Sequence, residues 1–358
     1  MQKATKRLPQ YHQVGASELP RFDLTDRELA ILAMIGEHRI ADSDQIASLL
    51  AHRWSEATTR RRLRLLHHAR FIRRVPSQIK YRKNPGSPPM AYQLDVRTVE
   101  LRQYPERFGV PLELVEDIPP GPYKWVSKSP NVGADFLEHA LFTTDIMATL
   151  ELSCRARGTV RLIKPREIIE TIIPAATRTR PKPFKWMVTV RWQGRNLRIG
   201  VEPDRVFGLE FVNEPPPNRV WFFLETDTGE ETVLPESQDL KPSSFLQKAA
   251  CYFETWRQGV HSEHFGFKNF RVLTVTATPS LLLPQTKKEL RKRGAVDAKT
   301  RSKIERRIGL LLEANRKATE GRGSNLFLFT DLPSLLVADD ILAMPWTSGT
   351  GKSVRLTD

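Results

Sequence analysis

Apolar and polar residues alternate along this chain in patterns that predict two folded parts. Helical periodicity begins directly after a polar, basic segment of 21 residues. Thr25 and Glu28 have the spacing of a capping box, which marks the start of a first helix. Apolar residues at helical spacing continue this helix and two more, which start near Asp42 and Ser55. The pattern therefore predicts three short helices in close succession.

Two strand-like runs follow the third helix. They are Phe71–Val75 and Ala91–Leu94, and the stretch between them, Ile79–Gly86, is basic. Such runs joined by a turn-rich segment predict a β-hairpin with a basic tip. Three helices followed by this hairpin predict a winged helix-turn-helix, whose third helix enters the major groove of DNA. We place this domain at residues 22–102.

Basic and hydroxyl side chains gather on the two elements of this domain that would touch DNA. Arginine and lysine contact phosphates and position a protein, whereas base contacts would come from the third helix. The alternative is a solvated, charged face on a protein-interaction module. The expected DNA contacts are Thr58, Thr59, Arg60, Arg61, Arg62 and Arg64 in the third helix, with Arg73, Arg74, Lys80, Arg82 and Lys83 in the hairpin.

A second folded part is expected after a Pro-rich segment, residues 103–132, which lacks clear periodicity and predicts a linker. Helical and strand patterns then alternate, which predicts an α/β domain at 133–347 with a mixed sheet flanked by helices. A basic helical insertion is expected at 285–321. The other expected elements are a helix from Gly133, strands at 159–164, 185–192, 195–209, 220–225, 270–276 and 326–330, and a helix from Ser243 or Ser244 to Arg257.

The composition of the chain, above all its net charge, indicates which kind of molecule it binds. The chain has 358 residues, enough for two domains, and a formal net charge of +15. So large an excess of Lys and Arg points to a polyanion, usually nucleic acid. No apolar run resembles a signal peptide or a membrane span, and only Cys154 and Cys251 occur, without the spacing of a zinc site. We therefore expect a protein of the bacterial cytoplasm with no membrane partner.

Acidic residues lie at the end of one predicted strand and at a proline break in the strand before it. The apolar run 220–224 predicts a strand buried on both faces, and it ends in Glu225-Thr226-Asp227. Pro203-Asp204 breaks the preceding strand, because proline cannot donate to a sheet ladder. Carboxylates at the ends of adjacent strands can hold a hard cation such as Mg²⁺. The alternative is that Asp204 caps a turn and Glu225 pairs with an arginine.

These features together resemble the replication-relaxation family, which is found on bacterial plasmids and other mobile elements. The resemblance covers roughly residues 22–347. It rests on the predicted winged helix, on Pro203-Asp204 and on the segment Glu225-Thr226-Asp227-Thr228-Gly229-Glu230. It also takes in Glu138-His139 and Lys248 with Tyr252 four residues later. The resemblance implies that the second domain has the PD-(D/E)XK nuclease fold.

The resemblance also implies a role for each matching residue. Asp204 and Glu225 would be catalytic acids and ligands of Mg²⁺ or Mn²⁺, and Glu138 would be an additional acid and ligand. The family's nuclease motif expects a lysine where this chain has Asp227. Lys248 on the following helix would then supply the missing ammonium, since lysine migration is known in this fold.

Two functions remain open. The first is metal-dependent hydrolysis of a phosphodiester, a nicking reaction in plasmid replication, DNA relaxation or transfer. The second is a catalytically silent initiator or regulator that binds double-stranded DNA and recruits replication or transfer proteins. An RNA-binding or membrane-surface protein is a weaker third reading, since no aromatic stacking motif or amphipathic anchor was found. A homodimer is one expected assembly, because winged helices often act as dimers.

Overall fold

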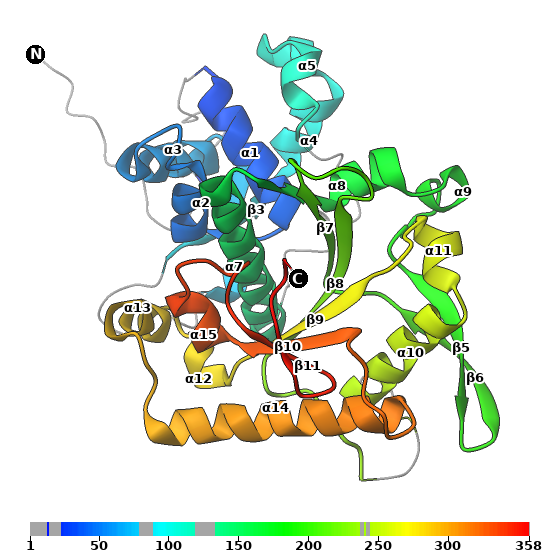
Figure 1. Cartoon of the computed structure of the whole chain (residues 1–358). Coiled ribbons are helices and arrows are strands. Elements are labelled where there is room, and N and C mark those ends of the chain that lie inside the picture. Colours follow the sequence, from blue (N-terminus) through cyan, green and yellow to red (C-terminus); the bar gives the residue numbers. More distant parts are fainter. Residues whose placement is uncertain are drawn as a thin grey trace, which may run out of the picture. The chain divides into compact units, whose positions relative to one another are not determined.

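The chain forms two compact units, Met1–Ala148 and Thr149–Asp358. The computed structural model describes residue 13 and residues 23–78, 89–118, 133–236, 240 and 244–357. Figure 1 shows the course of the chain and the element labels used below. The chain is a mixed α/β protein, as expected.

The first unit contains the three expected helices, and side chains cap all three. Thr25 and Glu28 form the predicted capping box. Asp42 and Ser55 accept backbone hydrogen bonds at the starts of the next two helices. A three-stranded sheet in the order β1-β3-β2 accompanies them. The bounds are α1 Asp26–His38, β1 Ala41–Asp42, α2 Ser43–Leu50, α3 Glu56–His68, β2 Ile72–Arg74 and β3 Ala91–Leu94.

The segment that follows differs from the expected linker at 103–132. Residues up to 118 form α4 (Val96–Gln103), η3 (Pro105–Phe108) and α5 (Leu112–Val115). The side chains of Val110, Val115 and Ile118 are buried in the same apolar cluster as the first three helices. Short helical turns without an amphipathic repeat gave no periodic signal, so the sequence did not reveal this packing. Residues 119–132 lie outside the described part.

The division between the units falls inside the long helix α7 (Ala134–Arg157), rather than before it. The first part of α7 packs on the first unit. The amide of Gln45 donates to Asp145 Oδ1 at 2.8 Å, and the hydroxyl of Thr144 donates to the carbonyl of Ile40 at 2.8 Å. The last part belongs to the second unit, where Arg157 pairs with Asp340.

The second unit is built on a seven-stranded mixed sheet in the order β12-β11-β10-β9-β8-β7-β4. Strands β8, β9 and β10 run parallel, and β7 and β11 flank them in antiparallel pairing. Strand β8 lies inside the sheet, between β9 and β7, and its apolar run is buried, as the sequence predicted. The strands are β4 Val160–Ile163, β7 Arg205–Phe211, β8 Arg219–Asp227, β9 Arg271–Thr276, β10 Phe327–Asp331, β11 Trp346–Ser348 and β12 Ser353–Val354.

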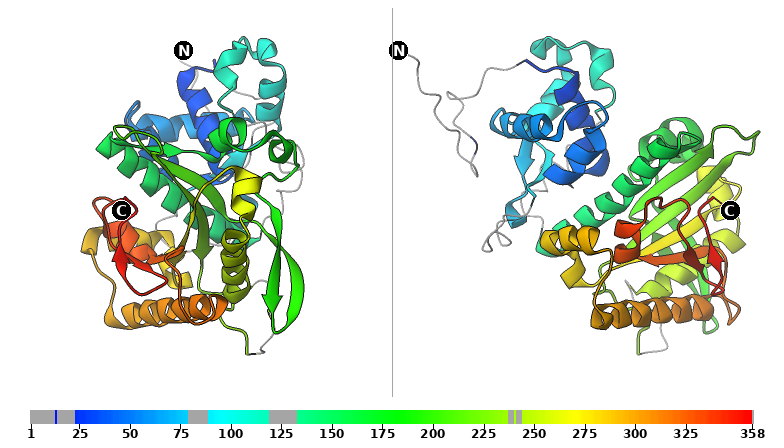
Figure 2. Two further views of the ribbon diagram at one scale, coloured as in Figure 1. Left: turned by 45° about the vertical axis from the view of Figure 1, so that its right-hand side comes forward. Right: turned by 60° about the vertical axis from the view of Figure 1, so that its left-hand side comes forward.

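Both faces of the sheet are apolar. On one face Phe223 packs in a cluster with residues of two helices, α10 (Phe245–Arg257) and α14 (Ala298–Ala318), which cross that side (Figure 2). On the other face Phe207 stacks on Phe222 with ring centroids 5.0 Å apart. The helices are α8 Pro165–Glu167, the π-helix η5 Ile168–Ile172, α9 Ala175–Arg178, α10 Phe245–Arg257, α11 Val260–Phe265, α12 Pro279–Leu282, α13 Pro284–Arg293, α14 Ala298–Ala318 and α15 Leu332–Val337.

Three expectations for this unit need correction. The single strand expected at 195–209 is two strands in different sheets, because Pro203 ends the ladder. Among the described residues, β6 (Arg195–Val201) pairs only with β5 (Trp186–Trp192). The basic tract 285–321 is two helices, separated at Gly294, whose φ of 71° is left-handed. Strand β10 is not the last, since β11 and β12 follow it.

Candidate functional site

Charged side chains meet where β8 ends and β7 begins. Glu225 lies near the end of β8, and Asp204 directly precedes β7. One oxygen of Asp204 accepts hydrogen bonds from the backbone N–H and the hydroxyl of Thr226, both at 2.7 Å. The break at Pro203 therefore turns Asp204 toward β8, where it ties the two strands together. The alternative, that Asp204 caps a turn, differs from these bonds, which cross to a strand 22 positions later.

An ammonium group joins this acid cluster from helix α10. The Nζ atom of Lys248 lies 3.0 Å from Glu225 Oε2 and 3.1 Å from the carboxylate of Glu231. Tyr252, one helical turn later, donates its hydroxyl hydrogen to the other oxygen of Glu225. The i, i+4 spacing puts Lys248 and Tyr252 on one face of α10, which explains why both reach the same carboxylate. Glu225 thus pairs with a lysine and a tyrosine, and not with an arginine.

Burial and charge shift the protonation of this cluster. Burial raises the pKa of Glu225 to about 7, although the ammonium of Lys248 acts in the opposite direction. Burial lowers the pKa of Lys248, but the carboxylates of Glu225, Glu231 and Asp204 outweigh it and hold the net pKa above its ordinary value. Lys248 is therefore a permanent cation, and it compensates acids that are costly to ionise when buried.

Asp227 is part of a separate buried ion pair. Its two oxygens lie 2.8 Å and 2.6 Å from the Nε and Nη2 atoms of Arg307 on α14. The hydroxyl of Thr276 donates to Asp227 at 2.7 Å, and Arg307 also donates to the carbonyl of Glu231 at 2.6 Å. The motif position that would carry a lysine thus holds an acid with an arginine as its fixed partner. Bidentate geometry of this kind is strong and directional.

The donor set of this cluster does not fit a divalent cation in the observed arrangement. Both oxygens of Glu225 are engaged by Lys248 and Tyr252, and the Glu225 side chain is 5% exposed. The ammonium sits where a cation would otherwise bridge the acids. Within the described ranges, no three His, Cys, Asp or Glu side chains are grouped to hold a metal. The binding of Mg²⁺ or Mn²⁺ by Asp204 and Glu225 would require Lys248 to move.

The family resemblance placed Asp204, Glu225 and Lys248 in one site, but nothing in the sequence indicated Glu231 in that cluster or Arg307 as the partner of Asp227. Glu231 follows the Thr-Gly turn after β8, a place where an acid gives no distinctive signal. Arg307 is one of many cations in the basic tract, and only the packing of α14 selects it. Glu138 lies in the part of α7 that belongs to the first unit, so its role in a metal site stays a prediction.

In the first unit, some of the expected DNA-contacting residues of α3 are exposed to solvent, and others are buried or bonded to the rest of the unit. Arg61 is exposed and, in the described part of the chain, forms no ion pair. Arg60 is also exposed, but it pairs with Asp44 and Glu56. The remaining hydroxyl and basic residues, Thr58 and Arg64, are partly buried.

Two of those expectations on α3 need correction. Thr59 is fully buried and its hydroxyl donates to the carbonyl of Ser55, so it does not face DNA. Arg62 pairs with Glu28, whose side chain is 0% exposed. Burial alone would raise the pKa of Glu28, but hydrogen bonds from Arg62 and Thr25 lower it below its ordinary value. Arg62 therefore holds α3 against α1.

The hairpin carries partly buried cations next to buried histidines. Arg73 and Arg74 are partly buried in β2, and burial lowers the pKa of Arg73. Burial lowers the pKa of His67 to about 3, and the charges of Arg74 and His68 act in the same direction. Lys80, Arg82 and Lys83, expected at the tip, lie outside the described residues.

The neutral state of His67 leads to an expected acid instability of the first unit. Its folded pKa of about 3 lies below the ordinary value of 6.5, so the unfolded chain binds more protons between these values. Above pH 6.5 His67 is neutral in both the folded and the unfolded chain, so it does not oppose folding. As the pH falls below 6.5, the unfolded chain takes up a proton at His67 and the free energy of unfolding decreases. Unfolding at about pH 5 should cost about 2 kcal/mol less than at about pH 8. His67→Gln should flatten this dependence in urea titrations, and an unchanged slope would contradict it.

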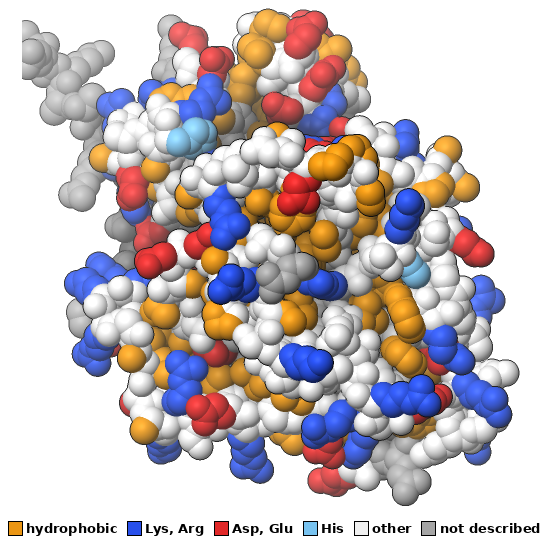
Figure 3. Space-filling model, viewed as in Figure 1, with side chains coloured by type: hydrophobic (Ala, Val, Ile, Leu, Met, Phe, Trp, Pro, Cys, Tyr) orange, Lys and Arg blue, Asp and Glu red, His pale blue; other side chains and the backbone are white. Residues whose placement is uncertain are grey.

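The surface of the second unit is rich in cations. Figure 3 shows more Lys and Arg than Asp and Glu side chains over the elements of this unit that face the viewer. Helix α14 contributes several, and its apolar face, including Ile304 and Leu311, is buried. The exposed basic residues of α14 are Lys299, Lys303, Arg306, Arg316 and Lys317. None of the helices in the described ranges combines the length and apolar character needed to cross a lipid bilayer.

Comparison with known proteins gives one match. A family model described as replication-relaxation matches residues 32–269, which is more than half of the chain and includes Asp204, Glu225, Lys248 and Tyr252. None of the curated proteins and none of the solved structures compared with the chain matches it.

Proposed function

The chain belongs to the replication-relaxation family, and from this premise we propose that it binds double-stranded DNA in the replication or transfer of a plasmid or other mobile element. The first unit would be a winged helix-turn-helix, with α3 in the major groove and the β2–β3 hairpin as the wing. The second unit would be a PD-(D/E)XK-like domain that holds DNA or a partner protein without cutting a strand. The observation that carries the proposal is the exposure of Arg60 and Arg61 on α3, of which Arg61 forms no ion pair in the described part of the chain.

The element order of the first unit supports DNA binding. Helices α1, α2 and α3 and the antiparallel pair β2–β3 follow one another as in a winged helix. Arg62 is used internally, so α3 is held firmly while Arg60 and Arg61 stay on its outer side. A net charge of +15 adds a long-range attraction for phosphates.

Metal-dependent nicking is the competing function. It has one observation in its favour, because the ammonium of Lys248 lies beside Glu225 as a migrated catalytic lysine would. Binding without hydrolysis is better supported, since Lys248 and Tyr252 occupy both oxygens of Glu225 and Arg307 occupies Asp227. Opening of the cluster by DNA and Mg²⁺ would be needed for nicking.

Removing the charge of one exposed arginine on α3 should weaken DNA binding without lowering the stability of the fold. Arg61→Ala should weaken duplex binding and reduce the slope of log K against log salt by about 0.9, because one phosphate contact is lost. Arg62→Ala is the matched control on the same helix. It should lower the free energy of unfolding by about 2 kcal/mol, because a buried carboxylate loses a charged partner. Fluorescence anisotropy with a labelled duplex and urea unfolding measure the two effects.

If Arg61→Ala leaves both duplex binding and its salt slope unchanged, α3 is not the DNA-contacting helix. Supercoiled plasmid serves as a second substrate in the same experiment, with Mg²⁺ or Mn²⁺ present. We expect a gel shift and intact supercoils. An open-circular product that depends on metal, and disappears in Glu225→Ala, would establish the nickase in place of the binding protein.

A further inference from the structure

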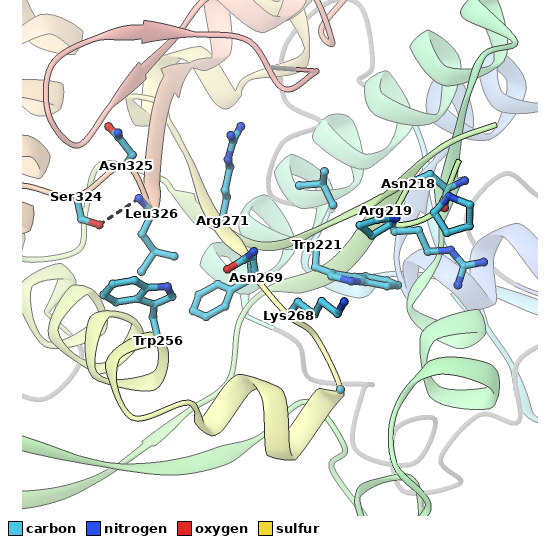
Figure 4. A pocket seen from close by; sticks show the side chains of 15 residues that line it. Asn218, Arg219, Trp221, Trp256, Lys268, Asn269, Arg271, Ser324, Asn325 and Leu326 are labelled. Atoms are coloured by element: carbon cyan, nitrogen blue, oxygen red, sulfur yellow. Dashed lines mark hydrogen bonds between the residues drawn. The ribbon is translucent and has the colours of Figure 1, made fainter. Parts of the chain in front are cut away.

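A cavity of about 900 Å³ opens at the other end of β8 from the acid cluster (Figure 4). Its walls come from the β7–β8 loop, from the segments that lead into β9 and β10, and from the end of α10. These segments meet because β8, β9 and β10 run parallel, so their first residues share one edge of the sheet. The volume is in the range of sites that enclose small organic ligands.

The lining of this cavity favours an anion. It contains the cations Arg219, Lys268 and Arg271, and none of its 15 lining residues is acidic. Arg219 pairs with Glu210, which lies outside the lining. Lys268 is exposed, and no ion pair to it is found in the described part of the chain. The side-chain amides of Asn218, Asn269 and Asn325 add groups that can donate and accept hydrogen bonds.

Aromatic rings stand beside these cations. Trp256, at the end of α10, is 46% exposed, an unusual state for so large an apolar side chain. Trp221 forms another part of the wall, and it stacks on Phe267 with centroids 4.3 Å apart and an interplanar angle of 4°. In Figure 4 the side chains of Lys268 and Asn269 lie between the two indole rings.

The position of Trp221 depends on a glycine in the neighbouring strand. A Cβ atom on Gly208 would lie 2.7 Å from the ring of Trp221, closer than contacting atoms can approach. Gly208 therefore lets the indole lie flat on β7, where it forms a fixed wall. Phe267 stacks on the same indole, so Trp221 is buried and shapes the cavity wall, while the exposed ring that a ligand can stack on is Trp256.

We propose that this cavity binds a segment of single-stranded DNA, with an unpaired base stacked on Trp256 and its phosphate held by Lys268 and Arg271. Exposed aromatic rings interleaved with cations are how proteins hold single strands without reading their sequence. The bases of a duplex are stacked on one another, so the cavity selects a separated strand. This site is independent of the duplex contact proposed for α3, and a replication protein meets both forms of DNA.

The test measures anisotropy of a labelled oligothymidylate of about 12 nucleotides with the full-length protein. Trp256→Ala should weaken its binding by about fivefold or more, the effect expected for losing one stacked base. Lys268→Ala should also weaken it about fivefold, because one phosphate contact is lost. Trp256→Phe should restore most of the affinity, because it keeps an aromatic face. Lys299→Ala, which removes an exposed charge from α14, is the matched control and should change little.

Other arms of the experiment decide between ligands. Duplex binding should be unchanged in Trp256→Ala, and oligothymidylate binding should be unchanged in Arg61→Ala, so either site can fail without the other. The proposal is overturned if Trp256→Ala and Lys268→Ala bind the oligothymidylate as the wild type does. It is also overturned if oligouridylate binds more tightly, which would indicate RNA, or if thymidine monophosphate binds while the oligothymidylate does not.

Discussion

Lys248→Met should lower the free energy of unfolding of the second unit by about 3 kcal/mol. The ammonium of Lys248 pairs with both Glu225 and Glu231, and burial raises the pKa of each of these acids. Methionine keeps most of the volume of the lysine stem and removes only the charge. Removal of one partner from a buried pair leaves the other charge uncompensated, which costs more than the pair contributes when intact. Urea unfolding at neutral pH measures the loss.

The pH dependence identifies the cause of this loss. The folded pKa of Glu225, about 7, lies above its ordinary value of 4.5, and removing the ammonium that lowers it would raise it further. Glu225 that is protonated in the folded protein contributes stability below the pKa that it has in the unfolded chain. This contribution is lost as the pH rises through the pKa that it has in the folded protein. Lys248→Met should therefore be less damaging at about pH 5 than at about pH 8.

Two further variants act as controls for this interpretation. Adding Glu225→Gln to Lys248→Met should recover part of the lost stability at high pH, because the buried charge is then absent. Lys317→Met removes a lysine whose pair with Glu313 is exposed on the surface of α14, and it should cost less than about 1 kcal/mol. An equal loss for Lys248→Met at both pH values would contradict the charge argument and indicate lost packing.

Local signals in the sequence predicted much of the fold. Helix starts at Thr25, Asp42 and Ser55 were found because a cap and its backbone partner lie within three residues of each other. Strand β8 was found because its run 220–224 is apolar throughout, which is typical of a strand buried on both faces. Pro203 marked a break between strands, although the sequence alone did not indicate that the halves join different sheets.

Contacts between distant segments could not be predicted in the same way. Lys248 was expected near the acids only through the family resemblance, since it is 23 positions from Glu225. Asp227 and Arg307 are 80 positions apart, and the basic tract offers many arginines that could have filled the role. The residues after Gln103 showed no period, yet Val110 and Val115 are buried. Short turns use few apolar anchors, so packing of this kind leaves no repeat in the sequence.

Asp227→Lys, which restores the lysine of the nuclease motif, should destabilise the second unit by about 4 kcal/mol and should not create a nicking activity. The new ammonium would face the guanidinium of Arg307, so an attraction between opposite charges becomes a repulsion between like charges. The hydroxyl of Thr276 would lose its acceptor as well. Thermal unfolding gives the stability, and supercoiled plasmid with Mg²⁺ or Mn²⁺ gives the activity.

A double variant tests whether the loss of stability comes from a lysine at position 227 or from the loss of its ion pair with Arg307. Asp227→Lys combined with Arg307→Glu reverses the two charges and should regain part of the stability, because a lysine–glutamate pair can span a similar gap without the bidentate geometry. If the reversed pair folds and still leaves plasmid intact, the motif lysine alone is not what separates this site from a nuclease. The cause would then be the engagement of Glu225 by Lys248 and Tyr252. If Asp227→Lys alone keeps the wild-type unfolding temperature and nicks plasmid with metal, the Asp227–Arg307 pair is not structural, and the site is a nuclease centre silenced by one residue.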